Sequence, residues 1–307
     1  MSGFFLPLNK RVKMIKKVIA ASILLISVTT ANYPQKINSI SSPDEKIKVN
    51  FFLDDGVPAY SVIFNGDTLL TNSPLGLQFK HIESMNSNFE ITEVIEGNFD
   101  ESWEPVWGTD SLIKNNYNEA KFYLKKSDDS GNEMILTFRA FNDGVGFRYE
   151  FPELNSGDSV YVSSEDTYFN FAEDMSAWWI PNDYDSYEHL YKNTKLSELK
   201  GINTPVAFES GDSLFMSIHE AALFDYAGMT LVRDKNNSLS LKSELVPWAD
   251  GIKVKTKAPF KTPWRTIQIS DTPARFVESH IIQNLNEPSK LEDVSWIKPM
   301  KYIGIWW

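Results

Sequence analysis

Hydrophobic and polar positions alternate in short runs from residue 46 to residue 270. A period of two places one set of side chains on each face of an extended chain, so each run predicts a β-strand. The runs are KIKVNFFL (46–53), YSVIFN (60–65), LGLQFK (75–80), KFYLKK (121–126), MILTFRAF (134–141), GFRYEFP (146–152), SVYVSS (159–164), SLFMSIHEA (213–221), SLSLKSEL (238–245), IKVKTK (252–257) and PWRTIQIS (263–270).

Turn residues separate many of these runs. They supply the positive φ angles that hairpins need. Frequent strands joined by such turns predict a mainly β fold, a large antiparallel β-sandwich, and the lack of a fixed-period repeat argues against a propeller. The turns are Asp54-Asp55-Gly56, Asn65-Gly66-Asp67, Ser130-Gly131-Asn132, Asn142-Asp143-Gly144 and Asn155-Ser156-Gly157.

Only one helix is predicted, over residues 272–284, with Thr272 as its cap and Pro273 in its first turn. A polar connector follows over 286–300, and the apolar run KYIGIWW occupies 301–307. This much apolar surface at the end of a free domain would favour aggregation. The run therefore resembles the first strand of a further domain.

The first 31 residues have the pattern of a secretory signal peptide. They contain no acidic residue, and basic residues precede an apolar stretch over 18–31 that is too short to span a membrane. We expect cleavage before Asn32 and export, to the periplasm, with an uncleaved anchor as the alternative. No later segment is apolar enough to span a membrane.

Composition narrows the choice of partner. The formal net charge is −11, which argues against nucleic-acid binding because phosphate contacts need a basic face. The chain has no Cys, so it contains neither disulfides nor a lipid-bearing Cys after the leader. Aromatic residues form 13% of the chain, including nine Trp, and indole faces stack on sugar rings. A carbohydrate ligand is favoured, although core packing accounts for many Trp residues.

The chemistry-bearing motifs are few. The four His residues lack zinc-site spacing, and neither a G-x-S-x-G motif nor a phosphate-binding Gly-rich loop is present. His219 and Glu220 could form an acid–base pair, but neighbours on a strand point to opposite faces. In WWIPNDYDSYEHLY (178–191), Asp183, Asp185 and Glu188 are carboxylates of the kind that bind Ca²⁺. Their spacing is not that of an EF-hand, and the residues alone favour a solvated loop.

Seven ordered blocks resemble glycoside hydrolase family 97 and cover nearly all of residues 38–307. The resemblance implies an exported bacterial α-glucosidase or α-galactosidase with an amino-terminal β-super-sandwich, similar to galactose mutarotases, followed by a catalytic (β/α)₈ barrel. The blocks are WEPVWGTDSLIKNNYNEAKFYL, FRAFNDGVGFRYEFP, WWIPNDYDSYEHLY, HEAALFDYAGM, TPWRTIQISD, NLNEPSK and SWIKPMKYIGIWW.

By this resemblance, residues 32–285 are the super-sandwich, 286–300 a linker and 301–307 the first strand of the barrel. The catalytic carboxylates then lie beyond Trp307, Trp306 lines the sugar site, and Glu188 in Tyr184-Asp185-Ser186-Tyr187-Glu188 binds Ca²⁺. His189 could compete with the metal for Glu188. The implied partners are an α-linked oligosaccharide and the chain's own barrel.

Two alternatives remain at this stage. One is a mutarotase-like aldose epimerase that uses a His acid and a Glu base, and the other is a stand-alone carbohydrate-binding module. The sequence does not choose between α-glucosidase and α-galactosidase, nor between inversion and retention of anomeric configuration, because those differences lie in barrel residues.

Overall fold

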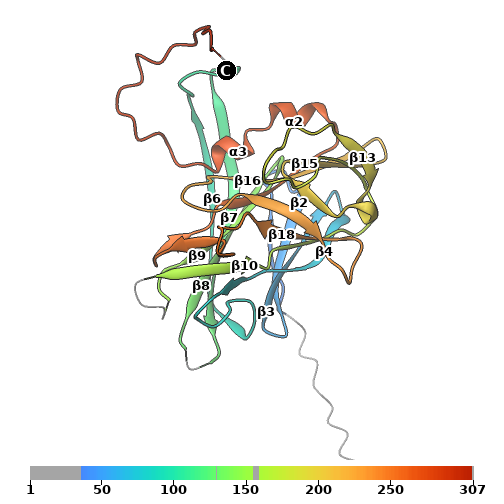
Figure 1. Cartoon of the computed structure of the whole chain (residues 1–307), viewed down its shortest axis with the longest axis vertical. Coiled ribbons are helices and arrows are strands. Elements are labelled where there is room, and N and C mark those ends of the chain that lie inside the picture. The colour runs from blue at the N-terminus through green and yellow to red at the C-terminus, as the bar shows by residue number, and fades with distance from the viewer. Residues whose placement is uncertain (1–35, 129, 155–158, 306–307) are drawn as a thin grey trace, which may run out of the picture. The chain divides into compact units, whose positions relative to one another are not determined.

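The computed structural model describes residues 36–128, 130–154 and 159–305, and the expected leader at 1–31 and Trp306 lie outside these residues. The described part of the chain is built of antiparallel strands with few and short helices (Figure 1). This confirms the predicted mainly β fold. None of the described helices has the length and apolar character needed to cross a membrane.

The largest sheet has ten strands. Its order is β13-β12-β15-β16-β21-β9-β8-β7-β6, and β20 pairs with β9 beside this path. The strands are β6 (Phe89–Trp103), β7 (Ile113–Lys126), β8 (Glu133–Phe141), β9 (Gly144–Phe151), β12 (Ser176–Trp179), β13 (Lys192–Lys195), β15 (Val206–Ser210), β16 (Leu214–Ala221), β20 (Phe260–Lys261) and β21 (Trp264–Ser270).

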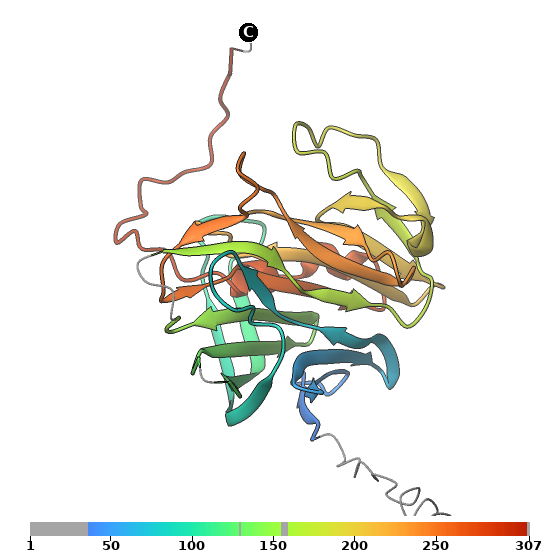
Figure 2. The same cartoon turned by 60° about the horizontal axis from the view of Figure 1, so that its bottom comes forward.

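Three smaller sheets lie against the ten-stranded sheet, in the orders β1-β2-β3-β4, β19-β10-β5 and β11-β18-β17-β14. The layers are seen in Figure 2. Their strands are β1 (Asn38–Ser41), β2 (Ile47–Asp54), β3 (Val57–Phe64), β4 (Asp67–Pro74), β5 (Leu77–Phe79), β10 (Val160–Glu165), β11 (Tyr168–Asn170), β14 (Gly201–Asn203), β17 (Met229–Arg233), β18 (Ser240–Leu245) and β19 (Val254–Thr256).

Aromatic side chains fill the space between the layers. Phe51 of β2 lies 4.2 Å, centroid to centroid, from Phe122 of β7. Tyr60 of β3 lies 5.0 Å from Phe147 of β9, which stacks at 5.3 Å on Phe138 of β8. All five side chains are buried. The alternation read from the sequence therefore places these residues in one sandwich core.

The predicted hairpin chemistry is present at the turns that the structure describes. Asn65 and Gly66 have φ of 51° and 93° between β3 and β4. Gly144, at the start of β9, has φ of 153° and faces β21 so closely that a Cβ would lie 2.3 Å from the carbonyl oxygen of Ile267. The turn predicted at 155–157 lies outside the described residues.

The expected helix over 272–284 forms as two shorter helices, α2 (Ala274–Glu278) and α3 (Ile281–Asn284). The break is at Ser279, whose extended backbone (ψ 132°) interrupts the helical hydrogen bonds. Thr272 does not cap the helix, because Pro273 occupies the N-cap position. Among the described residues one other helical turn, the 3₁₀ helix η1, spans Leu196–Glu198.

Residues 301–305, expected to begin a barrel strand, have no regular secondary structure and are exposed. A strand requires a neighbour that accepts and donates its backbone hydrogen bonds. No described strand supplies one to these residues.

Candidate functional site

The segment that carries Glu188 connects two paired strands, β12 and β13. Their register sets Trp179 opposite Lys192. Trp179 is buried, and its indole Nε1 donates a hydrogen bond to Thr194 Oγ1 at 3.1 Å. The next residue back, Trp178, points to the other face and is exposed, since side chains alternate along a strand. A packed strand pair thus anchors both ends of the loop.

The start of this loop is also fixed to β14. Asn182 N–H donates to Gly201 O at 3.3 Å, and Asn203 N–H donates to Ile180 O at 3.0 Å. The side chain of Asn182 lies directly over Gly201, where a Cβ would be 2.3 Å from Asn182 Oδ1. A side chain at 201 would have to displace the Asn182 amide, so glycine allows this close approach.

Asp183 organises the inside of the loop. Its Oδ1 accepts hydrogen bonds from the backbone N–H of Asp185 at 3.0 Å and of Ser186 at 3.4 Å. Its Oδ2 lies 3.1 Å from His189 Nε2. The backbone hydrogen bond from Asp185, together with the contact to His189, lowers the pKa of Asp183. Both oxygens of the Asp183 carboxylate thus stabilise the fold of the loop.

Glu188 differs from Asp183, because its side chain is exposed and has no hydrogen bond or ion pair among the described residues. Only its backbone N–H is engaged, donating to Ser186 Oγ at 3.2 Å. The histidine expected to compete for Glu188 instead contacts Asp183. Tyr187 and Leu190, which are close to Glu188 in the sequence, are exposed as well. Glu188 is thus available to a cation or a donor from outside this part of the chain.

The described residues do not complete a calcium site. They contain no group of three or more His, Cys, Asp or Glu side chains placed to hold a metal ion. Ca²⁺ takes about 6 to 8 oxygen ligands. Glu188 fits one ligand of such a site, provided that the other ligands come from elsewhere. Trp306, the other expected site residue, lies outside the described residues.

His219 and Glu220 do not form an acid–base pair. Glu220 is buried, and its two oxygens accept hydrogen bonds from Arg265 Nη1 at 2.6 Å and from Met229 N–H at 3.0 Å. His219 faces the other side of β16, where Nδ1 lies 3.2 Å from Thr204 Oγ1. The geometry expected of an epimerase is absent from this pair.

Sequence reasoning missed a buried charge cluster of Glu165, Arg265 and Glu220. Arg265 binds Glu165 through Nε and Nη2, at 2.7 and 2.6 Å. Burial alone would lower the pKa of Arg265, but attraction to Glu165 and Glu220 raises it. Since Glu165 and Arg265 are 100 residues apart, no local sequence pattern indicates the pair. All three side chains are buried and bound to one another, which indicates a structural role.

The Trp residues that the structure describes are dispersed instead of forming one cleft. Trp264 is buried, with the guanidinium groups of Arg139 and Arg148 at 4.8 and 4.4 Å from its ring. Trp103 lines a hollow of about 760 Å³ beside the β6–β7 pair, and Trp248 lines a separate hollow. Trp103 and Trp248 therefore belong to two separate candidate binding surfaces.

Comparison with known proteins identifies the fold. Residues 40–288 match the family Glycosyl-hydrolase 97 N-terminal. The chain is 26% identical over 321 residues to a retaining alpha-galactosidase of Bacteroides thetaiotaomicron. The aligned region covers 93% of this chain and 46% of that protein.

Solved structures show the same relationship. A Glycoside Hydrolase Family 97 enzyme from Pseudoalteromonas sp. strain K8, solved with panose and with acarbose, superposes with a TM-score of 0.82 and 37% identity, over 85% of this chain and 40% of that enzyme. A β-arabinopyranosidase gives a TM-score of 0.69 and 26% identity, over 76% of this chain and 40% of that enzyme. This chain thus spans less than half the length of these relatives. It belongs to the Glycosyl-hydrolase 97 N-terminal family.

Proposed function

We propose that this chain is the amino-terminal, active-site-completing domain of an exported, calcium-dependent α-glycosidase that acts on oligosaccharides. The observation that carries the proposal is the exposed Glu188 carboxylate, which has no partner in the described part of the chain and lies on an anchored loop of a domain from this family. The relatives named above support an α-glycoside substrate, because one is an α-galactosidase and another was solved with panose.

In this proposal Glu188 reaches out of the sandwich to a Ca²⁺ ion at the sugar site, and the remaining ligands come from the catalytic barrel. Bound there, the cation would orient and polarise substrate hydroxyl groups. Trp306, at the carboxyl end of the first barrel strand, would line the same sugar site. The role of this chain is to hold one carboxylate in place, and the paired strands β12 and β13 with the Asn182–Gly201 contact provide the necessary rigidity.

The test uses the enzyme extended to the length of its relatives, with Glu188→Gln compared against Asp185→Asn. Both changes remove one exposed carboxylate from the same loop. We expect Glu188→Gln to raise the calcium concentration needed to reactivate the chelated enzyme by about tenfold or more, with unchanged circular dichroism. Asp185→Asn should leave that concentration unchanged. Equal calcium dependence in Glu188→Gln and the unmodified enzyme would return Glu188 to the role of a solvated loop residue.

Export is tested separately. The basic, acid-free segment before Asn32 should be removed during secretion. Intact-mass analysis of periplasmic protein should give a chain beginning at or near Asn32. A mature species that retains Met1 or Met14 would contradict this part of the proposal.

A further inference from the structure

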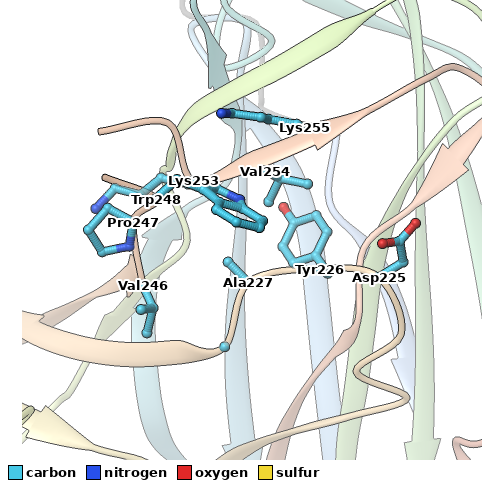
Figure 3. Close-up of a pocket in the computed structure, with 10 residues that line it drawn as sticks. Asp225, Tyr226, Ala227, Val246, Pro247, Trp248, Lys253, Val254 and Lys255 are labelled. Atoms are coloured by element: carbon cyan, nitrogen blue, oxygen red, sulfur yellow. The ribbon is translucent and has the colours of Figure 1, made fainter. Parts of the chain in front are cut away.

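An exposed tryptophan projects into a second hollow, away from the Glu188 loop. Trp248 follows β18 and is 62% exposed. The hollow has a volume of about 360 Å³ and is lined by three segments, 225–228, 246–248 and 253–255. Figure 3 shows the Trp248 indole directed toward Tyr226 and Val254. This volume is at the lower end of the range of small-molecule sites.

The backbone around Trp248 is fixed. Trp248 N–H donates to Ile252 O at 2.8 Å, and Gly251 N–H donates back to Trp248 O at 2.9 Å, closing a tight turn. Gly251 has φ of 81°, which glycine adopts without strain. Val246 N–H donates to Gly228 O at 3.1 Å. The backbone that carries the indole is therefore in place before any ligand arrives, which lowers the entropic cost of binding.

The wall opposite Trp248 is a neutral aromatic ring. The hydroxyl of Tyr226 donates to Glu165 Oε2 at 3.4 Å, which ties the ring to the buried charge cluster. Burial raises the pKa of Tyr226 well above its ordinary value, so the phenol stays protonated. Ala227 adds apolar surface beside this ring. These groups suit the apolar face of a ring-shaped ligand.

Charge at the rim argues against an anionic ligand. The ammonium of Lys253 is paired with Glu244 and donates to Leu245 O at 2.8 Å. Lys255 is paired with Asp250 at 2.6 Å and lies 5.5 Å from the centre of the Trp248 ring. With both lysines neutralised, exposed Asp225 has no partner among the described residues and leaves the rim with excess negative charge. A neutral molecule rich in hydroxyl groups fits this balance.

We propose that the hollow at Trp248 is an accessory binding site for a neutral pyranose unit of an oligosaccharide. The sugar ring packs on the Trp248 indole, while Asp225 accepts and Lys255 donates hydrogen bonds to its hydroxyl groups. This site goes beyond the proposed function, because it requires neither Glu188 nor Ca²⁺ and performs no catalysis. It would keep an oligosaccharide at the surface of the domain.

Isothermal titration of the chain with maltotriose, panose and raffinose tests the proposal. At least one should bind, and Trp248→Ala should weaken that binding by about tenfold or more. Asp225→Asn should weaken it by a few-fold. The matched control is Trp107→Ala, since Trp107 is similarly exposed, at 67%, but does not line the hollow. Circular dichroism checks that each variant is folded.

Glu188→Gln should bind these sugars as the unmodified chain does, which separates this site from the proposed calcium function. A glucuronic acid oligomer of similar length should bind more weakly than the neutral sugars. The proposal is overturned if none of the three neutral sugars binds, if Trp248→Ala binds them unchanged, or if Trp107→Ala loses binding equally.

Discussion

Arg265 and Glu165 form a bidentate ion pair inside the core, and both side chains are completely buried. Arg265 belongs to β21 of the ten-stranded sheet, whereas Glu165 belongs to β10 of a facing three-stranded sheet. The pair therefore joins the two layers of the sandwich. Glu220, directly opposite Arg265 on β16, completes the cluster.

Removing Arg265 should be strongly destabilising. Arg265→Met leaves Glu165 and Glu220 buried without a cation, a type of change that costs about 3–5 kcal/mol of unfolding free energy. Urea denaturation at neutral pH measures this loss. The control is Arg275→Met, which removes an exposed pair with Asp271 and should cost about 0.5 kcal/mol or less. Similar losses in the two variants would refute a structural role for the cluster.

Stability should depend on His219 in mildly acidic solution. Burial lowers the pKa of His219 from its ordinary value of 6.5, so the folded protein disfavours the proton. As the pH falls through 6.5, the unfolded chain binds that proton first, and the free energy of unfolding decreases. His219→Gln should flatten this part of the stability profile, measured by urea denaturation between neutral pH and about pH 5. An unchanged slope would assign the acid sensitivity to other groups.

Gly144 should tolerate no side chain. In Gly144→Ala the new Cβ meets the β21 backbone, so strand pairing between β9 and β21 must shift. Gly211→Ala is the matched control, because Gly211 also has positive φ, 56°, but no atom lies within 4 Å of its added Cβ. The control should cost about 1–2 kcal/mol and Gly144→Ala clearly more. Thermal denaturation ranks the two, and an equal loss would mean that the close approach is easily relieved.

The chain by itself should hydrolyse no α-glycoside. Glycoside hydrolysis needs two available carboxyl groups at the bond that breaks. In the proposed function both groups come from the catalytic barrel, and the carboxylates Glu165 and Glu220 of this chain are buried and bound to Arg265. Nitrophenyl α-glucoside and α-galactoside should therefore be cleaved no faster than by a mock purification. Cleavage above that background would show that this chain carries its own catalytic groups.

Anomer interconversion is the corresponding test of the epimerase alternative. Because His219 and Glu220 lie on opposite faces of β16, the chain should not accelerate the mutarotation of fresh α-galactose. Polarimetry follows the reaction. An acceleration that disappears in His219→Gln would restore the epimerase interpretation.

The sequence predicted the strands in which hydrophobic and polar side chains alternate between the two faces. In β8 and β9, buried and less buried positions follow the alternation seen in MILTFRAF and GFRYEFP. The strand β6 was missed because most of its residues are exposed on both faces, which leaves no alternation to detect. For β7, only the end over residues 121–126 was recognised; its first residues, 113–116, pair among the described strands with β6 alone.

The site was only partly predictable for a related reason. The position of Glu188 on a polar, aromatic loop is visible in the local sequence. The pairing of His189 with Asp183 instead of Glu188 depends on how the loop folds back, and the hollow at Trp248 depends on three segments brought together by β17, β18 and β19. Such relationships are set by tertiary structure.

The exposed strand β6 also bears on how molecules of this protein meet one another. It is one edge of the ten-stranded sheet, and an edge strand presents backbone groups that a strand of a second molecule can pair with. Acidic side chains stand along this edge at Glu90, Glu93, Glu96, Asp100 and Glu101. Two such edges approaching each other would place like charges side by side, which opposes the intermolecular sheet growth that leads to fibrils.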